Sequence, residues 1–139
     1  MIVLDTNVVS ELLRPAPAPE VLDWLEGQPS TSLFVTTVTH AEIRYGIAIL
    51  PAGQRRDALH TLASEMLGED FAGQSLPFDE AAAALFATIA AERRAQGRPI
   101  SQFDAQIAAI TRSRGATLAT RNVRDFTGCG VALTNPWNP

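Results

Sequence analysis

Four acidic side chains stand where a predicted strand ends or a predicted helix begins: Asp5 directly after the apolar run 2–4, Glu42 and Asp104 in the first turns of two helices, and Asp125 shortly after another apolar segment. Carboxylates that lie within a few ångströms of one another do not all ionise without a positive partner. Carboxylate oxygens are also the ligands that Mg²⁺ and Mn²⁺ prefer. If the fold brings these acids together, the sequence predicts a metal site.

Each acid also has a purely structural interpretation. The segments Thr39–Glu42 and Ser101–Asp104 both fit the capping box, in which an acid three residues after a serine or threonine closes the start of a helix. Asp5, or Thr6 or Asn7, could cap the helix that follows it, and Asp125 could be an ordinary turn residue. Capping does not explain why an acid marks each strand end. Both interpretations stay open, because a capping carboxylate keeps an oxygen free for a ligand.

The elements that must position these acids alternate between strands and helices, which predicts an α/β fold. Apolar, β-branched runs indicate strands, and apolar residues at helical spacing indicate helices. We expect strands at 2–4, 33–38, 74–77, 117–119 and 131–133, and helices at 8–13, 20–25, 39–50, 55–67, 80–96 and 101–114. The expected architecture is one domain over residues 1–137 with a short, mostly parallel sheet covered by helices on both faces. Ligands of such sheets bind beyond the carboxyl ends of the strands.

Composition excludes several classes of protein. The chain has 139 residues, the size of one domain, and its eleven basic residues are all arginine. The absence of lysine excludes P-loop nucleotidases, Schiff-base enzymes and protein kinases. The single cysteine, Cys129, excludes an internal disulfide and a cysteine-based zinc site. With no signal peptide and no apolar run long enough to cross a membrane, we expect a cytoplasmic protein.

The net charge of −4 argues against a protein that coats nucleic acid through its bulk charge. The four candidate site acids account for this whole excess. The charge is therefore compatible with a polyanionic substrate that a metal ion bridges to the protein. The arginines Arg112, Arg121 and Arg124 gather around the last helix and the loop after it, where they could hold RNA or simply form a solvated surface.

Four short motifs occur in order and at suitable spacing: IVLDTN at 2–7, AE at 41–42, Asp104 ahead of IAA at 107–109, and ATRN at 119–122 ahead of Asp125. Together they resemble a PIN domain. Within that family the chain resembles the VapC toxins of bacterial type II toxin–antitoxin pairs, especially the FitB-like branch, to which the segment 135–137 is also similar. The resemblance implies a Mg²⁺-dependent ribonuclease, with Mn²⁺ as an alternative metal, that hydrolyses RNA phosphodiester bonds. It also implies a homodimer and a VapB-like antitoxin as inhibitor.

The resemblance also implies roles for individual residues. Asp5, Glu42 and Asp104 match the acidic metal ligands, and Thr6 and Thr120 match hydroxyls that line the site. The fourth acidic position is ambiguous. FitB-like relatives carry an aspartate where this chain has Asn122, whereas many VapC proteins have asparagine there and an acid three residues on. The latter pattern makes Asp125 a candidate catalytic residue and Asn122 a supporting one.

Two rival functions follow from the same motifs. The segment from Asp5 to Val8 is close to the opening motif of haloacid-dehalogenase-type phosphatases, but that chemistry needs a second aspartate where this chain has Asn7, and a lysine. A non-catalytic PIN-like module that binds RNA or a protein partner is the alternative that remains. Replacing Asp5 with asparagine discriminates between the ribonuclease and this non-catalytic module. The substitution abolishes cleavage by an enzyme and leaves binding by a scaffold intact.

Overall fold

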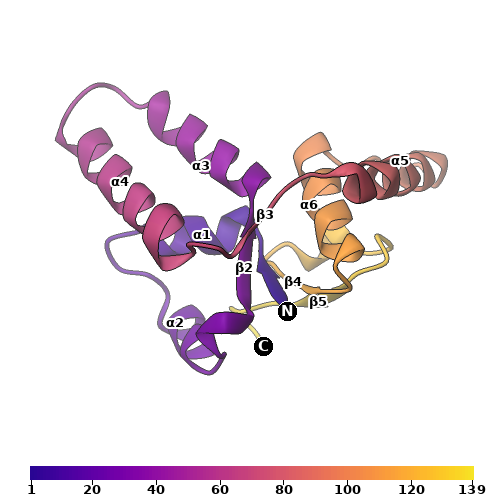
Figure 1. Ribbon diagram of the computed structural model, residues 1–139, viewed down its shortest axis with the longest axis horizontal. Coiled ribbons are helices and arrows are strands. Elements are labelled where there is room, and N and C mark those ends of the chain that lie inside the picture. The colour runs from indigo at the N-terminus through magenta and orange to yellow at the C-terminus, as the bar shows by residue number, and fades with distance from the viewer.

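The computed structural model describes all 139 residues, and its five strands form one sheet (Figure 1). The strands are β1 (Ile2–Leu4), β2 (Leu33–Thr36), β3 (Ser75–Leu76), β4 (Thr117–Ala119) and β5 (Ala132–Thr134), and their order in the sheet is β3-β2-β1-β4-β5. Every pairing is parallel. The five carboxyl ends therefore lie at one edge, and the predicted α/β class with a parallel sheet is confirmed.

Six helices cover the sheet: α1 (Thr6–Leu12), α2 (Pro19–Glu26), α3 (Thr37–Ala48), α4 (Gln54–Glu65), α5 (Glu80–Ala95) and α6 (Gln102–Ser113). Short 3₁₀ turns at Ser30–Ser32 and Val123–Phe126 and a π turn at Met66–Asp70 complete the secondary structure. Figure 1 shows α1 to α4 on one side of the sheet and α5 with α6 on the other. None of the helices is long and apolar enough to cross a membrane.

The strands contribute side chains to two separate cores, one under each helical layer. Val3 and Leu118 belong to the core under α5 and α6, whereas their neighbours Leu4 and Ala119 belong to the core under α1 to α4. Successive side chains of a strand point to opposite faces of the sheet, so apolar residues in unbroken runs serve both cores. This explains why the strands read as short continuous apolar runs.

One predicted boundary is wrong at the start of α3. The expected strand 33–38 ends at Thr36, and the side-chain hydroxyl of Thr36 accepts a hydrogen bond from the backbone N–H of Thr39 at 3.1 Å. This threonine is the N-cap of α3, three residues before the predicted cap Thr39, so the helix begins at Thr37 and Glu42 lies in its second turn rather than its first. Threonine suits both a strand and an N-cap, and here its capping bond decides the boundary.

Two other helix starts carry the expected caps. Asp5 is the N-cap of α1, which begins at Thr6 rather than at residue 8, and its carboxylate accepts a hydrogen bond from the Thr6 N–H. Ser101 caps α6 by accepting a hydrogen bond from the Asp104 N–H at 3.2 Å. Capping and a functional role therefore meet at the same residues.

The strand order places a crevice beside Asp5. The chain runs from the central strand β1 outward through β2 and β3, and then returns to the other side of β1 as β4 and β5. In open α/β sheets the ligand crevice lies at such a reversal, beyond the carboxyl ends of the strands. The Asp5 N–H donates a hydrogen bond to the carbonyl oxygen of Ala119 at 2.9 Å. The residues that follow β1 and β4 are thereby held side by side.

The buried Arg93 ties α5 to the loop that follows β4. Its Nε donates to the carbonyl oxygen of Arg98 at 2.8 Å, and its Nη1 donates to the carbonyl oxygens of Asp125 and Thr127 at 2.8 and 3.2 Å. The same nitrogen lies 3.4 Å from the Cys129 sulfur. These bonds hold α5 against the segment that carries the predicted residue Asp125.

Replacing Arg93 with methionine is expected to lower the free energy of unfolding by about 2 kcal/mol, because three backbone carbonyls lose a charged donor. Arg94→Met is the matched control, since Arg94 neighbours Arg93 in α5 and is exposed. Urea denaturation of the two variants measures the difference. Equal stability of the two would show that the buried guanidinium contributes nothing.

Candidate active site

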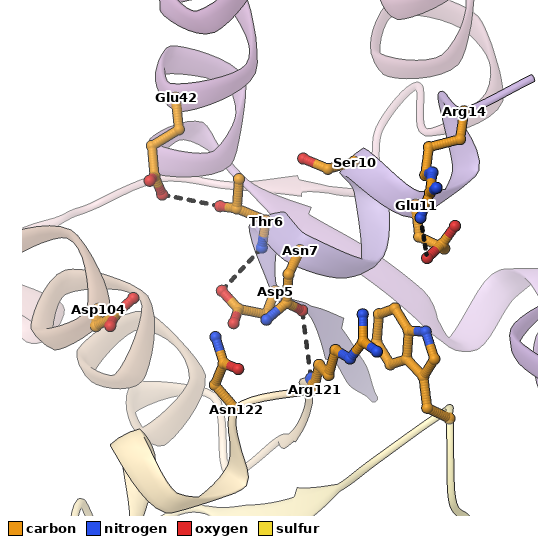
Figure 2. Close-up of a pocket in the computed structure, with 11 residues that line it drawn as sticks. Asp5, Thr6, Asn7, Ser10, Glu11, Arg14, Glu42, Asp104, Arg121 and Asn122 are labelled. Carbon is orange, nitrogen blue, oxygen red and sulfur yellow. Dashed lines mark hydrogen bonds and ion pairs between the residues drawn. The ribbon is translucent and has the colours of Figure 1, made fainter. Parts of the chain in front are cut away.

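A pocket of about 490 Å³ opens beyond the carboxyl ends of β1 and β4 (Figure 2). Its lining is polar apart from one tryptophan: Asp5, Thr6, Asn7, Ser10, Glu11, Arg14, Glu42, Asp104, Arg121, Asn122 and Trp137. The residues come from the ends of β1 and β4, from α1, α3 and α6, and from the C-terminal segment. Such a lining suits a charged, hydrated ligand rather than an apolar one.

Asp5 is 4% exposed and lies at the centre of this arrangement (Figure 2). Its Oδ1 accepts a hydrogen bond from the Thr6 N–H at 2.8 Å, and its Oδ2 accepts one from the Thr120 hydroxyl at 2.7 Å. The first bond comes from α1 and the second from the end of β4, so the carboxylate is fixed from both sides of the crevice.

Glu42 and Asp104 approach the pocket from two other helices. The Thr6 hydroxyl donates to Glu42 Oε1 at 2.8 Å and lies 2.9 Å from the Thr39 hydroxyl, which links α1 to α3. Asp104 lies in the first turn of α6, directly above its cap. Figure 2 shows the Glu42, Asp5 and Asp104 side chains on the same side of the pocket. The fold therefore brings together three of the four predicted acids.

Burial raises the pKa of Asp5 to about 6. The hydrogen bonds from Thr120 and Thr6 favour the ionised form and limit this rise, whereas the charges of Asp104 and Glu42 add to it. Part of the Asp5 population thus keeps its proton at pH values where an exposed aspartate is fully ionised.

The other two acids are shifted in the same direction. Burial, together with the Asp104 charge, raises the pKa of Glu42. Burial also raises the pKa of Asp104, and the neighbouring charge of Asp125 adds to it. No basic side chain forms an ion pair with any of the three, since the one ion pair of the chain joins Arg14 to Glu11. The site holds unbalanced negative charge, which a bound cation would relieve.

The donor set suits Mg²⁺ or Mn²⁺ better than a softer metal. Both cations prefer oxygen ligands, and no cysteine or histidine lines the pocket. No three acidic, histidine or cysteine side chains are grouped so as to hold an ion by themselves. Mg²⁺ usually binds one or two carboxylates and keeps several waters. Two of the three carboxylates, Asp5, Glu42 and Asp104, are therefore enough to bind Mg²⁺.

Comparison with known proteins gives the family. Residues 2–127 match the PIN domain. The chain belongs to the PIN-domain family. It is 39% identical over 138 residues to the toxin FitB of Neisseria gonorrhoeae, and 38% identical over 139 residues to the VapC ribonuclease Y4jK of Sinorhizobium fredii. Each alignment covers at least 99% of both chains.

A solved structure agrees with this membership. The structure of FitAB bound to a DNA fragment contains a chain 39% identical to this one, with a TM-score of 0.92. The match covers 100% of this PIN domain and 97% of that chain. The predicted family is therefore confirmed, and the predicted fold with it.

Besides Thr120, which is buried behind Asp5, three predicted residues of this PIN domain do not line the pocket. Asp125 is exposed in the turn after β4, although its charge reaches Asp104. Arg124 is exposed in the same turn. Arg112 lies in the last turn of α6, where its guanidinium packs against Gly130. Their proposed parts in catalysis and RNA binding stay predictions that rest on the sequence alone.

Sequence reasoning missed one face of α1. Asn7, Ser10, Glu11 and Arg14 all line the pocket, and they are spaced at i, i+3, i+4 and i+7. This spacing puts Asn7, Ser10 and Glu11 on one side of α1, and Arg14 continues the same stripe just after the helix ends. A helix start at Thr6 would have revealed the stripe, whereas the predicted start at residue 8 left Asn7 outside the helix.

Arg121 and Trp137 form the wall of the pocket next to that face. The Arg121 guanidinium lies over the indole ring, 5.0 Å from its centre, which is within the range of a cation–π contact. The backbone N–H of Arg121 donates to Asn7 Oδ1 at 3.3 Å. Of the three predicted RNA-binding arginines, Arg121 alone lines the pocket.

Thr120 is fully buried behind Asp5, and its hydroxyl forms hydrogen bonds with three partners. Its hydroxyl donates to Asp5 Oδ2 and accepts hydrogen bonds from the Asn122 N–H at 3.0 Å and from Asn7 Nδ2 at 3.3 Å. The predicted supporting residues Thr120 and Asn122 therefore do meet at the site, where they organise the loop after β4.

Replacing Thr120 with valine, which has the same shape, is expected to lower the free energy of unfolding by about 1–2 kcal/mol. It is also expected to raise the pKa of Asp5 further, because a hydrogen bond to the ionised form is lost. Thr88→Val is the control, since Thr88 is exposed on α5. Chemical denaturation at pH 7 measures the stability, and a Thr120→Val protein as stable as Thr88→Val would contradict the expectation.

Proposed function

We propose that this chain is a metal-dependent ribonuclease and the toxin of a toxin–antitoxin pair. The observation that carries the proposal is the meeting of Asp5, Glu42 and Asp104, from three elements, in one polar pocket where no basic side chain forms an ion pair with any of them. The names of the relatives support it, since one is a ribonuclease and another is a toxin. Neutralisation by Mg²⁺ or Mn²⁺ fits both the acids and a polyanionic substrate.

Each acid then has a distinct part. Asp5 and Asp104 would hold the metal ion, whose chemistry is to polarise a phosphate oxygen and lower the pKa of a bound water. Glu42 has its Oε1 engaged by the Thr6 hydroxyl, which leaves Oε2 to take a proton from the attacking water. The raised pKa of Glu42 makes it a better proton acceptor than an exposed glutamate.

Two arginines complete the site. Arg14 and Arg121 line the pocket away from Asp104, and they supply positive charge for the flanking phosphates of an RNA strand (Figure 2). Salt is therefore expected to weaken RNA binding by this chain, in spite of its net negative charge. Asn122, which replaces an acid of the FitB-like pattern, contributes an amide in place of a fourth charge.

Incubation of the purified protein with total RNA tests the proposal. Wild type and Asp5→Asn are compared in Mg²⁺, in Mn²⁺ and in a chelator, and the variant controls for contaminating ribonuclease. We expect discrete fragments with wild type in either metal and none in the chelator or with the variant. Identical RNA patterns for wild type and Asp5→Asn would favour the non-catalytic module instead.

An apolar groove beside the active site suits the antitoxin partner that we propose. The groove has a volume of about 1130 Å³ and lies between α1, α3, α4 and the segment after α1. It shares Thr6, Ser10, Arg14 and Glu42 with the active-site pocket. A VapB-like helix seated there would reach the acids and block RNA. The homodimer stays a prediction from the family resemblance.

Leu62 on α4 lines this groove and is 47% exposed. We expect Leu62→Asp to weaken binding of the cognate antitoxin at least tenfold, because a charge is placed in an apolar contact. RNA cleavage should remain at the wild-type level, since Leu62 does not line the active-site pocket. Isothermal titration with the antitoxin measures the effect, and unchanged affinity would place the partner elsewhere.

A further inference from the structure

Glu11 lines the pocket and carries a buried hydrogen-bond acceptor that has no partner. Its side chain is 5% exposed, and its Oε2 is the one buried side-chain polar atom of the chain without a hydrogen-bond partner. Burying such an atom unpaired costs the free protein a hydrogen bond that water would otherwise supply. The proposed chemistry needs Asp5, Glu42 and Asp104 and leaves Glu11 without a role.

The other oxygen of Glu11 is only loosely held. Arg14 Nη1 lies 3.5 Å from Oε1, and the Arg14 side chain is 66% exposed. A long contact to an exposed, flexible arginine contributes little. A ligand that displaces Arg14 can meet Oε1, and rotation of the Glu11 carboxyl group would bring the unpaired Oε2 to the same ligand. The freed guanidinium remains beside the pocket to bind a phosphate.

The position of Glu11 fits a flanking nucleotide rather than the scissile phosphate. Figure 2 shows Glu11 and Arg14 at one end of the pocket and Asp104 at the opposite end, with Asp5 between them. Arg121, stacked on Trp137, borders the same end. Unpaired RNA bases stack on planar guanidinium or aromatic groups and present their hydrogen-bonding edges to side chains.

We infer that Glu11 is a specificity residue that accepts hydrogen bonds from a guanine base next to the cleaved bond. The inference rests on the proposed ribonuclease function. Guanine alone presents two neighbouring donors, N1–H and the exocyclic amino group, on the edge that pairs with other bases. These two donors match the two oxygens of one carboxylate, whereas adenine, cytosine and uracil each present a single donor there.

Cleavage of a random-sequence RNA pool, followed by sequencing of the product ends, tests the inference. Wild type, Glu11→Gln and the control Asp23→Asn, an exposed acid on α2, are compared in Mg²⁺. We expect guanine to be enriched roughly tenfold at one fixed position beside the cut for wild type and the control. Glu11→Gln should cleave the pool but lose this enrichment, since glutamine offers one acceptor and one donor.

A second measurement does not depend on the variant's folding. Replacing that guanine with inosine, which lacks the exocyclic amino group, should lower wild-type kcat/KM about tenfold through KM. Guanine enrichment that survives in Glu11→Gln, cleavage without base preference, or indifference to inosine would each overturn the role of Glu11 and leave the ribonuclease intact. No cleavage by wild type in Mg²⁺ or Mn²⁺ would overturn both.

Discussion

Asp5→Asn is expected to lower the rate of RNA cleavage by on the order of 10³-fold or more and to leave the protein folded. The variant removes a carboxylate from the centre of the site and with it a ligand for the metal. Asparagine is as good an N-cap as aspartate, so the start of α1 is retained. The expected outcome is a folded, inactive protein, which single-turnover cleavage and circular dichroism together measure.

Asp23→Asn provides the matched control for that experiment. Asp23 is an exposed aspartate of α2 and lines none of the pockets described above. Its substitution changes net charge by the same amount and should leave cleavage unchanged. If Asp5→Asn retained more than a tenth of the wild-type rate, Asp5 could not be the central ligand.

The stability of the metal-free protein is expected to fall as pH rises, because of Asp5. In the unfolded chain this carboxyl ionises near pH 3.8, whereas in the folded protein its pKa is about 6. Between these values the folded state holds a proton that the unfolded state has released, so raising the pH favours unfolding. The full effect amounts to about 3 kcal/mol, and about 2 kcal/mol of it falls between pH 4.5 and pH 7.5.

Urea denaturation in a chelator measures this effect as a difference between two proteins. The free energy of unfolding of wild type, minus that of Asp5→Asn, should decrease by about 2 kcal/mol from pH 4.5 to pH 7.5. Subtracting the free energy of unfolding of Asp5→Asn cancels the contributions of groups that titrate alike in both proteins. A difference that stays constant or increases with pH would mean that burial does not raise the pKa of Asp5.

The meeting of the candidate side chains in one pocket could be predicted where a residue's position follows from a strand end. Asp5 follows β1 and Thr120 follows β4, and parallel strands bring such ends to one edge of the sheet. Asp104 was found for a related reason, because the first turn of α6 faces the same edge. Glu42 lies in the second turn of α3 rather than in the predicted first turn, and it still lines the pocket. Local sequence was therefore enough to predict that Asp5, Glu42 and Asp104 lie near one another.

The site residues and element boundaries that were missed depended on a contact distant in sequence and on two helix caps. Trp137 reaches the pocket from the C-terminus, and its pairing with Arg121 cannot be read from the spacing of either residue. The α1 face with Glu11 was missed because the helix begins at Thr6, under the cap of Asp5. Threonine at 36 is compatible with both strand and cap, so propensity alone could not fix the end of β2, which the capping bond from the Thr39 N–H decides.

Binding of Mn²⁺ at pH 7.5, followed by electron paramagnetic resonance, tests the central claim most directly, since it reports on the metal and not on the RNA. Wild type and Asp23→Asn should bind the ion with equal affinity, and Asp5→Asn should bind it at least tenfold more weakly. Equal Mn²⁺ affinity in all three proteins, or RNA cleavage by wild type in excess chelator, would contradict a catalytic metal held at Asp5.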